Sequence, residues 1–319
     1  MQQQSLARCA VALGLLCAAW AWPGRAWADE HALILWIGEY ADPQVRIIGL
    51  EHDAALARSM AQALGVPDAN RLERSNAQLT HSGLKNALAD LRARVRPGDG
   101  VFVYFSGHGR QVQRLSGGPG CSEGLATFEG GIYFDLLLRD ELDALAQRAS
   151  RVVMFNDSCF SGGAASKSFE PGELAEAAPK VYPPGLESEA QADAQYYPKS
   201  LPGGGATDSA SANASCGVHV NPVSKAFGGL AQSPRQHGVL YLAGSAANEA
   251  AYPTPQGSVA TRAWAACLQD PGTASNNNSA GVLTGAALSG CANAWIKRHT
   301  RYRQTITLVG NGQLPLRRF

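Results

Sequence analysis

Long apolar runs alternate along this chain with segments of helical periodicity, and this alternation limits the folds that it can adopt. The apolar runs of strand length lie at residues 31–40, 101–107 and 151–158. Segments with apolar side chains at helical spacing lie at residues 49–66, 80–95 and 138–149. Strands buried on both faces have continuous apolar runs and belong to parallel sheets flanked by helices. The sequence therefore predicts an α/β fold, an open, mostly parallel sheet with helices on both faces.

The composition changes after residue 163, and this change predicts an insert within the domain. Residues 164–236 are rich in Pro, Gly, Ser and Ala and have no sustained period, which predicts a low-complexity linker. The fold then resumes, with strands predicted at 237–245 and 305–310 and helices at 259–268 and 281–299. Residues 110–131 are predicted as a second long loop, rich in Gly. The domain thus consists of a larger part, 29–163, and a smaller part, 237–319, that completes it.

The first 28 residues have the features of a secretory signal. One positive charge, Arg8, precedes an apolar stretch that is too short for a membrane span. Ala26 and Ala28 occupy the −3 and −1 positions of a cleavage site, so we expect removal before Asp29. The alternative is an uncleaved membrane anchor. No later segment is long and apolar enough to span a bilayer, so the sequence predicts a secreted or periplasmic protein with no stable membrane insertion after signal removal.

Charge and cysteine content exclude some functions. The formal net charge is +1, and no basic run or interleaved aromatic stripe indicates a nucleic-acid partner.

Five cysteines follow the signal, so at least one thiol stays free or pairs between chains. We expect Cys159 to be free; the other four allow three pairings, and segment order favours Cys267–Cys291 and Cys121–Cys216. No Cys/His cluster has zinc spacing, so no metal is predicted.

Two polar residues follow neighbouring apolar runs at the predicted carboxyl edge of the sheet, where open α/β folds bind ligands. His108 follows the run "VFVYFSG", and Cys159 follows "RVVMFNDS", 51 residues later. An imidazole beside a thiol accepts its proton and later protonates the leaving group. The flanking glycines let backbone N–H groups approach a reacting carbonyl. Each residue alone has an ordinary structural explanation, but the pair predicts a cysteine nucleophile with a histidine acid–base.

The segments "VFVYFSGHG" and "VVMFNDSCFSGG" resemble the His and Cys motifs of caspase-fold cysteine peptidases, in the metacaspase and bacterial caspase-like branch. "RIIGLEHDAALARSMAQALGV" resembles the first helix of that family, and "QTITLVGNG" resembles its closing segment. The resemblance implies a caspase-like fold and hydrolysis of peptide bonds through a thioester. It also implies Cys159 as nucleophile, His108 as acid–base, and an oxyanion hole made by Gly109 and Cys159. The insert then separates the large-subunit-like and small-subunit-like parts.

The expected specificity follows from local charge. Asp53 and Ser106 match substrate-pocket positions of metacaspases, and Asp157 lies two residues before the nucleophile. Carboxylates in a pocket favour a cation, so we expect cleavage of protein or peptide substrates after Arg or Lys. The structural alternatives are a solvated helix face for Asp53 and a turn for Asp157. Basic residues in the linker predict that the enzyme cuts itself there; they are Lys167, Lys180, Lys199, Lys225 and Arg235.

The sequence also departs from the metacaspase pattern. Phe160 follows the nucleophile where His is common. The calcium-binding stretches keep only a few carboxylates, at Glu123, Glu129, Asp140 and Glu141. Calcium prefers six to eight oxygen ligands, and these stretches are poor in them, so no cofactor is predicted and calcium is kept only as the alternative. Two alternatives to an Arg/Lys peptidase remain: an inactive caspase-like scaffold, and a peptidase of the same fold with different specificity, such as asparaginyl. The sequence predicts no oligomeric state.

Overall fold

A six-stranded sheet lies at the centre of the computed structural model, which describes residues 28–113, 121–158, 180, 238–246, 249–270, 272 and 281–318. The strand order is β10-β8-β7-β3-β1-β2. These strands are β1 (Glu30–Trp36), β2 (Arg71–Ser75), β3 (Gly100–Ser106), β7 (Arg151–Asp157), β8 (Val239–Ala243) and β10 (Thr307–Gly310). Neighbouring strands pair in parallel except β10, which is antiparallel to β8. The apolar runs thus form the centre of the sheet, as predicted.

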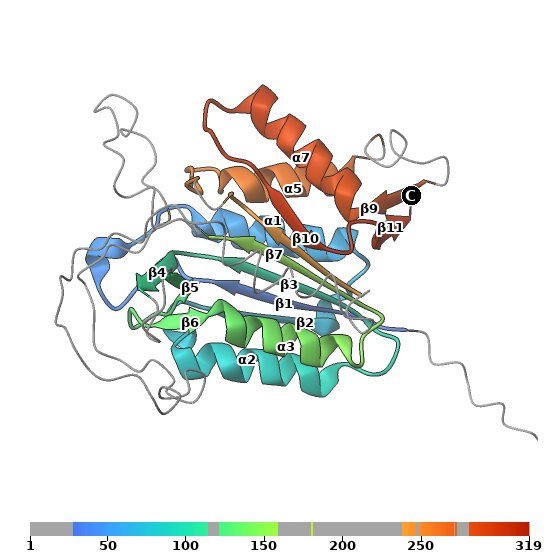
Figure 1. Ribbon diagram of the computed structural model, residues 1–319, viewed down its shortest axis with the longest axis horizontal. Coiled ribbons are helices and arrows are strands. Elements are labelled where there is room, and N and C mark those ends of the chain that lie inside the picture. The colour runs from blue at the N-terminus through green and yellow to red at the C-terminus, as the bar shows by residue number, and fades with distance from the viewer. Residues whose placement is uncertain are drawn as a thin grey trace, which may run out of the picture.

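Helices cover both faces of this sheet (Figure 1). One face carries α1 (Leu50–Ala63), α5 (Val259–Gln269) and α7 (Gly285–His299), and the other carries α2 (His81–Arg94) and α3 (Asp135–Ala146). Short 3-10 turns lie at Pro43–Val45, Asp68–Asn70 and Asn76–Gln78. Strand side chains alternate between the two hydrophobic cores: Val103 packs with the α2 and α3 side, and Tyr104 with the α1, α5 and α7 side. The predicted open α/β sheet with helices on both faces is confirmed.

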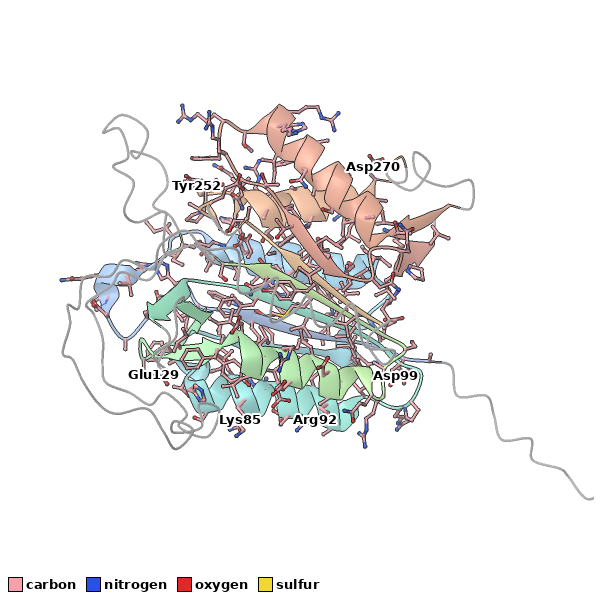
Figure 2. The ribbon with its side chains drawn as sticks, in the orientation of Figure 1. Lys85, Arg92, Asp99, Glu129, Tyr252 and Asp270 are labelled. Carbon is pink, nitrogen blue, oxygen red and sulfur yellow. A yellow bond between two sulfur atoms is a disulfide. The ribbon has the colours of Figure 1, made fainter. Side chains whose placement is uncertain are left out.

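The helix α2 has one apolar face and one polar face. Leu84, Leu88 and Leu91 of α2 are buried against the sheet. Lys85 and Arg92 of the same helix point away from it (Figure 2). Thr80 begins this helix, because its hydroxyl accepts a hydrogen bond from Gly83 N. The helical periodicity and the cap together explain why the predicted bounds of this helix, 80–95, agree so closely with the structure.

A small antiparallel sheet occupies much of the predicted Gly-rich loop, so that part of the prediction is wrong. Its strands are β4 (Gly109–Gln113), β5 (Cys121–Ala126) and β6 (Ile132–Phe134). A Cβ on Gly124 would lie 2.2 Å from the carbonyl oxygen of Tyr133, so only glycine allows β5 and β6 to approach this closely. The glycines that predicted a loop therefore permit tight strand pairing.

The predicted helix at 281–299 also begins later than expected. Residues Val282–Thr284 form the strand β9, which pairs antiparallel with β11 (Pro315–Arg318). The helix α7 starts at Gly285, because the Thr284 hydroxyl accepts a hydrogen bond from Ala287 N. A capping threonine thus separates a three-residue strand from the helix, and helical periodicity alone does not detect it.

Residues 238–318 contribute β8 and β10 to the same sheet that residues 28–158 begin. Cys267 on α5 and Cys291 on α7 form a disulfide, which confirms that predicted pair. Cys159, Cys216, residues 1–27 and all of the linker 164–236 except Lys180 lie outside the described residues. The predictions that concern them therefore stay predictions. Within the described ranges, no helix combines the length and apolar character needed to cross a bilayer.

Candidate active site

The central strands β3 and β7 end side by side at one edge of the sheet. Ser106 and Asp157, the last residues of the two strands, are partners in the parallel register. His108 follows two residues after the first, and Cys159, outside the described residues, follows two residues after the second. The sheet topology therefore directs both chain segments of the predicted dyad to the same edge.

The His108 imidazole is buried, with 5% of the residue exposed. Its Nε2 atom lies 2.7 Å from the carbonyl oxygen of Val45. A carbonyl only accepts hydrogen bonds, so Nε2 carries the proton and Nδ1 is the basic nitrogen. Burial lowers the pKa of His108 to about 4, although hydrogen bonding to Val45 and to the backbone of Lys180 opposes this. The imidazole is thus neutral at neutral pH and able to accept a proton.

Tyr40 positions the segment that carries this histidine. The Tyr40 hydroxyl accepts a hydrogen bond of 2.7 Å from the backbone N–H of His108. The two rings lie 5.0 Å apart between centroids. The carbonyl of His108 in turn accepts from Ala126 N on β5. The histidine is therefore fixed by β3, by β5 and by the loop before α1.

Asp53, Ser106 and Asp157, the three residues predicted to bind substrate, surround one buried lysine of the linker. Lys180 Nζ donates hydrogen bonds to Ser106 Oγ at 2.8 Å, to the backbone oxygen of Asp157 at 3.0 Å and to Asp53 Oδ2 at 3.3 Å. It also forms an ion pair of 3.2 Å with Asp157 Oδ1. All four side chains are completely buried. This arrangement is an acidic pocket, defined by Asp53, Ser106 and Asp157, that holds a cation.

The amino end of α5 contacts both carboxylates of the acidic pocket, which the sequence analysis did not predict. Ser258 donates to Asp53 through its backbone N–H and its hydroxyl. Thr261 donates to Asp157 Oδ2 through its backbone N–H, at 3.1 Å, and through its hydroxyl. The first N–H groups of a helix favour nearby anions. A Ser-x-x-Thr sequence at a helix start would have given only a weak signal, because such residues cap many helices.

Burial raises the pKa of Asp157, and the neighbouring Asp53 carboxylate raises it further. The ammonium group of Lys180 acts in the opposite direction, as does the hydrogen bond from Thr261. Two desolvated carboxylates this close together repel one another, so a cation between them lowers the electrostatic cost. The acidic pocket therefore favours a positively charged side chain over a neutral or negative one.

The backbone of Lys180 is held as firmly as its side chain. Its N–H donates to the Ala251 carbonyl, and its own carbonyl accepts from Gly109 N, each at 3.0 Å. Tyr252, the next residue after Ala251, donates its backbone N–H to Gln304 Oε1, and Gln304 Nε2 donates to Gly244 O. Gln304, in the predicted closing segment, thus holds residues 251–252, to which the backbone of Lys180 is bonded.

Buried polar side chains hold the end of β7, which leads to Cys159. Ser158 Oγ donates to Asn156 Oδ1 at 2.8 Å, and Asn156 Nδ2 donates to the Tyr241 hydroxyl at 2.7 Å. Both Asn156 and Ser158 are fully buried. These bonds connect the end of β7 to β8, so the small part of the domain helps to set the path of the chain into the predicted nucleophile.

The carboxylates named for calcium each have protein partners where their side chains are described. Glu129 Oε1 accepts from His81 N, and Glu141 forms an ion pair with Arg92. Asp140 pairs with Arg139. Each of these contacts gives the acid a role within the fold.

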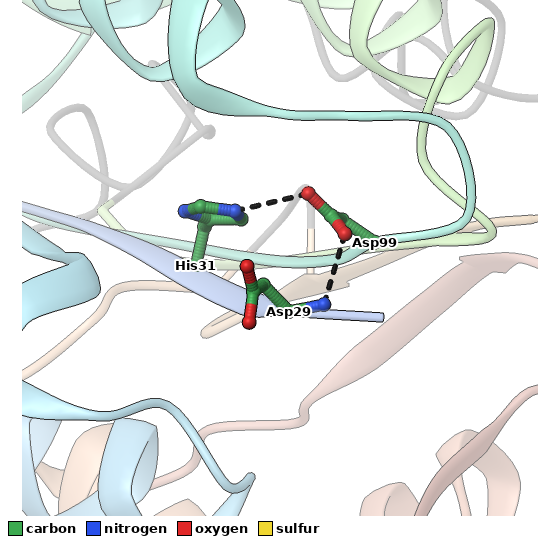
Figure 3. A group of neighbouring side chains, drawn as sticks. All are labelled: Asp29, His31 and Asp99. Carbon is green, nitrogen blue, oxygen red and sulfur yellow. Dashed lines mark hydrogen bonds and ion pairs between the residues drawn. The ribbon is translucent and has the colours of Figure 1, made fainter. Parts of the chain in front are cut away.

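One other group of side chains has the composition of a metal site, among the described ranges. Ligand atoms of Asp29, His31 and Asp99 lie within 4.8 Å of one another (Figure 3). Asp99 Oδ1 already accepts from Asp29 N, and its Oδ2 accepts from Arg96 N and contacts His31 Nε2. The group therefore ties the start of β1 to the turn before β3, and it lies at the opposite end of the molecule from Tyr252 (Figure 2).

Comparisons with known proteins agree with this architecture. Residues 29–304 match the family model Peptidase_C14, described as the caspase domain. Metacaspase-6 of Arabidopsis thaliana is 26% identical over 143 residues, which are 42% of this chain and 38% of that protein. Metacaspase-4 of the same plant is 31% identical over 94 residues, 28% of this chain and 22% of that protein. The matches thus cover well under half of either relative.

Solved structures show the same fold at low sequence identity. The protein GSU0716 of Geobacter sulfurreducens superposes with a TM-score of 0.56 at 16% identity, over 89% of this chain and 94% of that one. Caspase-1 of Spodoptera frugiperda superposes with a TM-score of 0.51 at 10% identity, over 88% and 86% of the two chains. The sheet order and helix layers described above are thus those of a caspase-like fold.

Proposed function

The chain belongs to the caspase domain family of cysteine peptidases, and we propose that it is an exported endopeptidase that cleaves after Lys or Arg and processes its own linker after Lys180. Cys159 serves as nucleophile and His108 as acid–base. Gly109 and Cys159 supply the oxyanion hole, and Asp53, Ser106 and Asp157 bind the basic side chain of the substrate. Its partners are proteins or peptides with a basic residue at the cleaved position.

One observation carries this proposal: Lys180 occupies the acidic pocket as a substrate residue does. Its ammonium group contacts both carboxylates, at 3.3 Å from Asp53 and 3.2 Å from Asp157. Its carbonyl accepts a hydrogen bond from Gly109 N, one of the two predicted oxyanion donors. The bond that follows this carbonyl, between Lys180 and Val181, is therefore the one we expect to be cleaved.

The reaction follows from these positions. The Cys159 thiol loses its proton to His108 Nδ1, and its sulfur adds to the carbonyl carbon of Lys180. Gly109 N–H stabilises the oxyanion that forms. The bond to Val181 breaks as His108 returns the proton to the leaving nitrogen, and this acid–base assistance is worth about 10²–10⁴ in rate. Water then hydrolyses the thioester, which releases the Lys180 carboxylate and restores the thiol.

Charge excludes acidic substrates from this pocket. An aspartate side chain there would add a third carboxylate to Asp53 and Asp157, both fully buried. Like charges in a desolvated site repel strongly. An asparagine side chain would leave both carboxylates without a counter-charge. Basic residues alone satisfy the pocket, which supports cleavage after Lys or Arg over the asparaginyl alternative.

Export is supported by the signal features of residues 1–28 and by the disulfide between Cys267 and Cys291. Structural disulfides persist in oxidising compartments outside the cytosol. We therefore propose that the mature protein starts at Asp29 and acts in the periplasm or outside the cell. The mass of the protein recovered from that compartment tests this: a chain that retains its first 28 residues would contradict it.

Self-processing is tested by incubating purified protein and measuring intact masses. We expect the wild type to yield two fragments that end at Lys180 and begin at Val181. Cys159→Ala and Lys180→Gln should both stay intact at this bond, the first without a nucleophile and the second without a cation. Lys199→Gln, in the same linker, is the matched control and should process normally. Cleavage at Lys180 in Cys159→Ala protein would disprove the mechanism.

Substrate specificity is tested with fluorogenic peptides that carry Arg, Lys, Asp or Asn at the cleaved position. Processed wild-type enzyme should cleave only the Arg or Lys peptides, and Cys159→Ala should cleave none. Preference for Asp would refute the pocket assignment. Absence of cleavage in every case, together with an intact linker, would favour the alternative of an inactive caspase-like scaffold.

A further inference from the structure

We infer that the acidic pocket selects lysine over arginine at the cleaved position. The inference deepens the proposed function and rests on it, because it concerns the same pocket. Three features of the pocket lead to it: the number of acceptors around Lys180 Nζ, the protein donors that already occupy most of the carboxylate oxygens, and the complete burial of the pocket.

The acceptors match the three protons of an ammonium group. Lys180 Nζ donates to Ser106 Oγ, to the backbone oxygen of Asp157 and to Asp53 Oδ2, at 2.8, 3.0 and 3.3 Å. Asp157 Oδ1 approaches to 3.2 Å as an ion-pair partner, without the alignment of a hydrogen bond. A lysine side chain has three donors, whereas a guanidinium has five in a rigid plane. Each lysine proton thus has one acceptor.

Protein groups already donate to the other carboxylate oxygens of the pocket, except Asp157 Oδ1. Asp53 accepts from the Ser258 backbone N–H and hydroxyl, and also from the Ser106 hydroxyl. Asp157 Oδ2 accepts from the Thr261 backbone N–H and hydroxyl. Because the Thr261 hydroxyl donates to this carboxylate, the Tyr104 hydroxyl, 2.6 Å away, donates to Thr261. Of the two extra donors of a guanidinium, one would find Asp157 Oδ1, and the other would compete with existing bonds or stay unpaired.

The pocket is also closed around the side chain of Lys180. Lys180, Asp53, Asp157 and Ser258 are all completely buried. Two glycines lie close to the carboxylates: a Cβ at Gly244 would lie 3.0 Å from Asp157 Oδ1, and one at Gly257 would lie 3.1 Å from Asp53 Oδ1. Gly257 has φ +103°, so its backbone is fixed in a conformation that other residues rarely adopt. The longer and wider side chain of an arginine would therefore push against the two carboxylates and the glycines that contact them.

Two peptides with the linker sequence "LAEAAPKVYPP" test the inference, one natural and one with arginine in place of its lysine. We expect processed wild-type enzyme to cleave the lysine peptide with at least about tenfold higher kcat/KM, since buried unpaired donors are strongly rejected. Equal values, or a preference for arginine, would overturn the selectivity and leave the proposed peptidase intact. Cleavage of neither peptide would overturn both.

Linker variants give an independent test in the intact chain. Lys180→Arg should slow self-processing at least about tenfold, whereas Lys199→Arg should leave it unchanged. In the Cys159→Ala background, which does not process, Lys180→Arg should also lower the melting temperature, because the guanidinium distorts the closed pocket. Unchanged processing and an unchanged melting temperature would refute the inference.

Removal of the nearest acceptor gives a third test. Ser106→Ala deletes the hydroxyl that lies 2.8 Å from Lys180 Nζ and creates space beside it. We expect it to reduce cleavage of the lysine peptide more than that of the arginine peptide, so the lysine-to-arginine ratio of kcat/KM falls. A ratio that stays constant or rises would show that the acceptor count does not set the preference.

Discussion

The buried charges of the acidic pocket are unequal in their dependence on a cation. Asp53 receives three hydrogen bonds besides the one from Lys180, through both of its oxygens. Asp157 receives two from Thr261, both at Oδ2, and its Oδ1 has Lys180 Nζ as its described ionic partner. Burial and the Asp53 charge raise the pKa of Asp157. A basic side chain that enters the pocket therefore stabilises the charged form of Asp157 more than that of Asp53. Loss of Asp157 should weaken binding of the basic side chain more than loss of Asp53.

We predict that Asp157→Asn slows self-processing by at least about 30-fold. Loss of one partner from a buried charge pair costs roughly 2–5 kcal/mol, and about 1.4 kcal/mol is a factor of ten. The asparagine keeps the size of the side chain and an acceptor for Thr261, but it removes the charge opposite Lys180. The matched control is Asp140→Asn on α3, which removes a carboxylate paired with Arg139. Equal processing rates in the two variants would contradict the role given to Asp157.

The pH dependence of self-processing should reflect the burial of His108. Its pKa is lowered to about 4 while Lys180 fills the pocket, and the neutral imidazole is the form that accepts the thiol proton. The rate should therefore hold from pH 7 down to about 5 and fall with a midpoint near 4. Rates from intact mass between pH 3.5 and 8 would measure this, and a midpoint near the ordinary value of about 6.5 would contradict it.

The residues of the candidate site could be predicted from the sequence only where they follow a strand or match a motif. Asp53, Ser106 and Asp157 meet in one pocket because strands β3 and β7 end together beside α1. Nothing in the sequence distinguishes Lys180 from Lys167 or the other linker lysines, because a segment without periodicity has no register against the sheet. Its pairing with Ala251 and Gly109 is visible only in three dimensions.

Among the secondary-structure elements, α5 has a functional part that its periodicity does not indicate. Its sequence predicts an amphipathic helix, and its apolar face is indeed buried in the core. The helix axis, however, brings Ser258 and Thr261 against the two carboxylates. That direction depends on the packing of α5 against α7 and against α1, and α1 is distant in the sequence. Long-range packing therefore decides what a helix terminus contacts, and local sequence does not.

We predict that Thr261→Val raises the KM for lysine peptides about tenfold and changes kcat little. The substitution keeps the shape of the side chain and the backbone N–H, but it removes the hydroxyl that donates to Asp157. A hydrogen bond to a charged group contributes about 1.5–3 kcal/mol. Steady-state kinetics of the processed enzyme separate KM from kcat, and circular dichroism checks the fold.

The control for this variant is Thr300→Val. Thr300 lies at the carboxyl end of α7, and its hydroxyl donates to Ile296 O. It removes a hydroxyl that bonds within its own helix and makes no described hydrogen bond to Asp53, Ser106 or Asp157, so KM should stay at the wild-type value. If both variants changed KM equally, the effect of Thr261→Val would be a general loss of helix stability. The role of α5 in binding the basic side chain would then be refuted.

At the scale of the whole molecule, the residue that follows the predicted export signal is bonded to the central sheet through its backbone. Asp29 N donates to Asp99 Oδ1 at 2.9 Å (Figure 3). Asp29 O accepts from Gly100 N. Burial acts to raise the pKa of Asp99, but hydrogen bonds from Arg96 and Asp29 and the contact with His31 outweigh it and hold that pKa below its usual range. Asp99 is therefore a buried carboxylate that is already directed at the nitrogen of Asp29.

If the signal is removed before Asp29, that nitrogen becomes an α-ammonium group beside Asp99. We predict that a chain starting at Asp29 is more stable by about 1 kcal/mol than one with Ala28 retained, because a charge-assisted hydrogen bond replaces a neutral one. The value is modest because Asp29 itself is exposed. Urea unfolding of the two chains, both with Cys159→Ala to prevent processing, would measure the difference.

The pH dependence of this difference identifies its cause. Pairing with Asp99 raises the pKa of the α-ammonium above its unfolded value of about 7.7–8.0. The added stability is therefore fully present below that value and is lost as the pH rises through the higher folded value. The charged groups around Asp29 N are its own side chain, His31, Asp99, and the arginines that line the adjacent cavity, Arg94, Arg96 and Arg148. The arginines stay charged over this pH range, so they do not produce such a loss.

Asp99→Asn in both chains provides the deciding comparison. The asparagine still accepts from Asp29 N but has no charge, so the advantage of the shorter chain should disappear at pH 7. A difference that persists in Asp99→Asn protein, or one that does not decrease above pH 8, would show that removal of Ala28 acts by another route. If both predictions hold, cleavage of the signal does more than release the protein: it creates the cation that Asp99 binds, and it fixes the first strand of the sheet that carries the candidate active site.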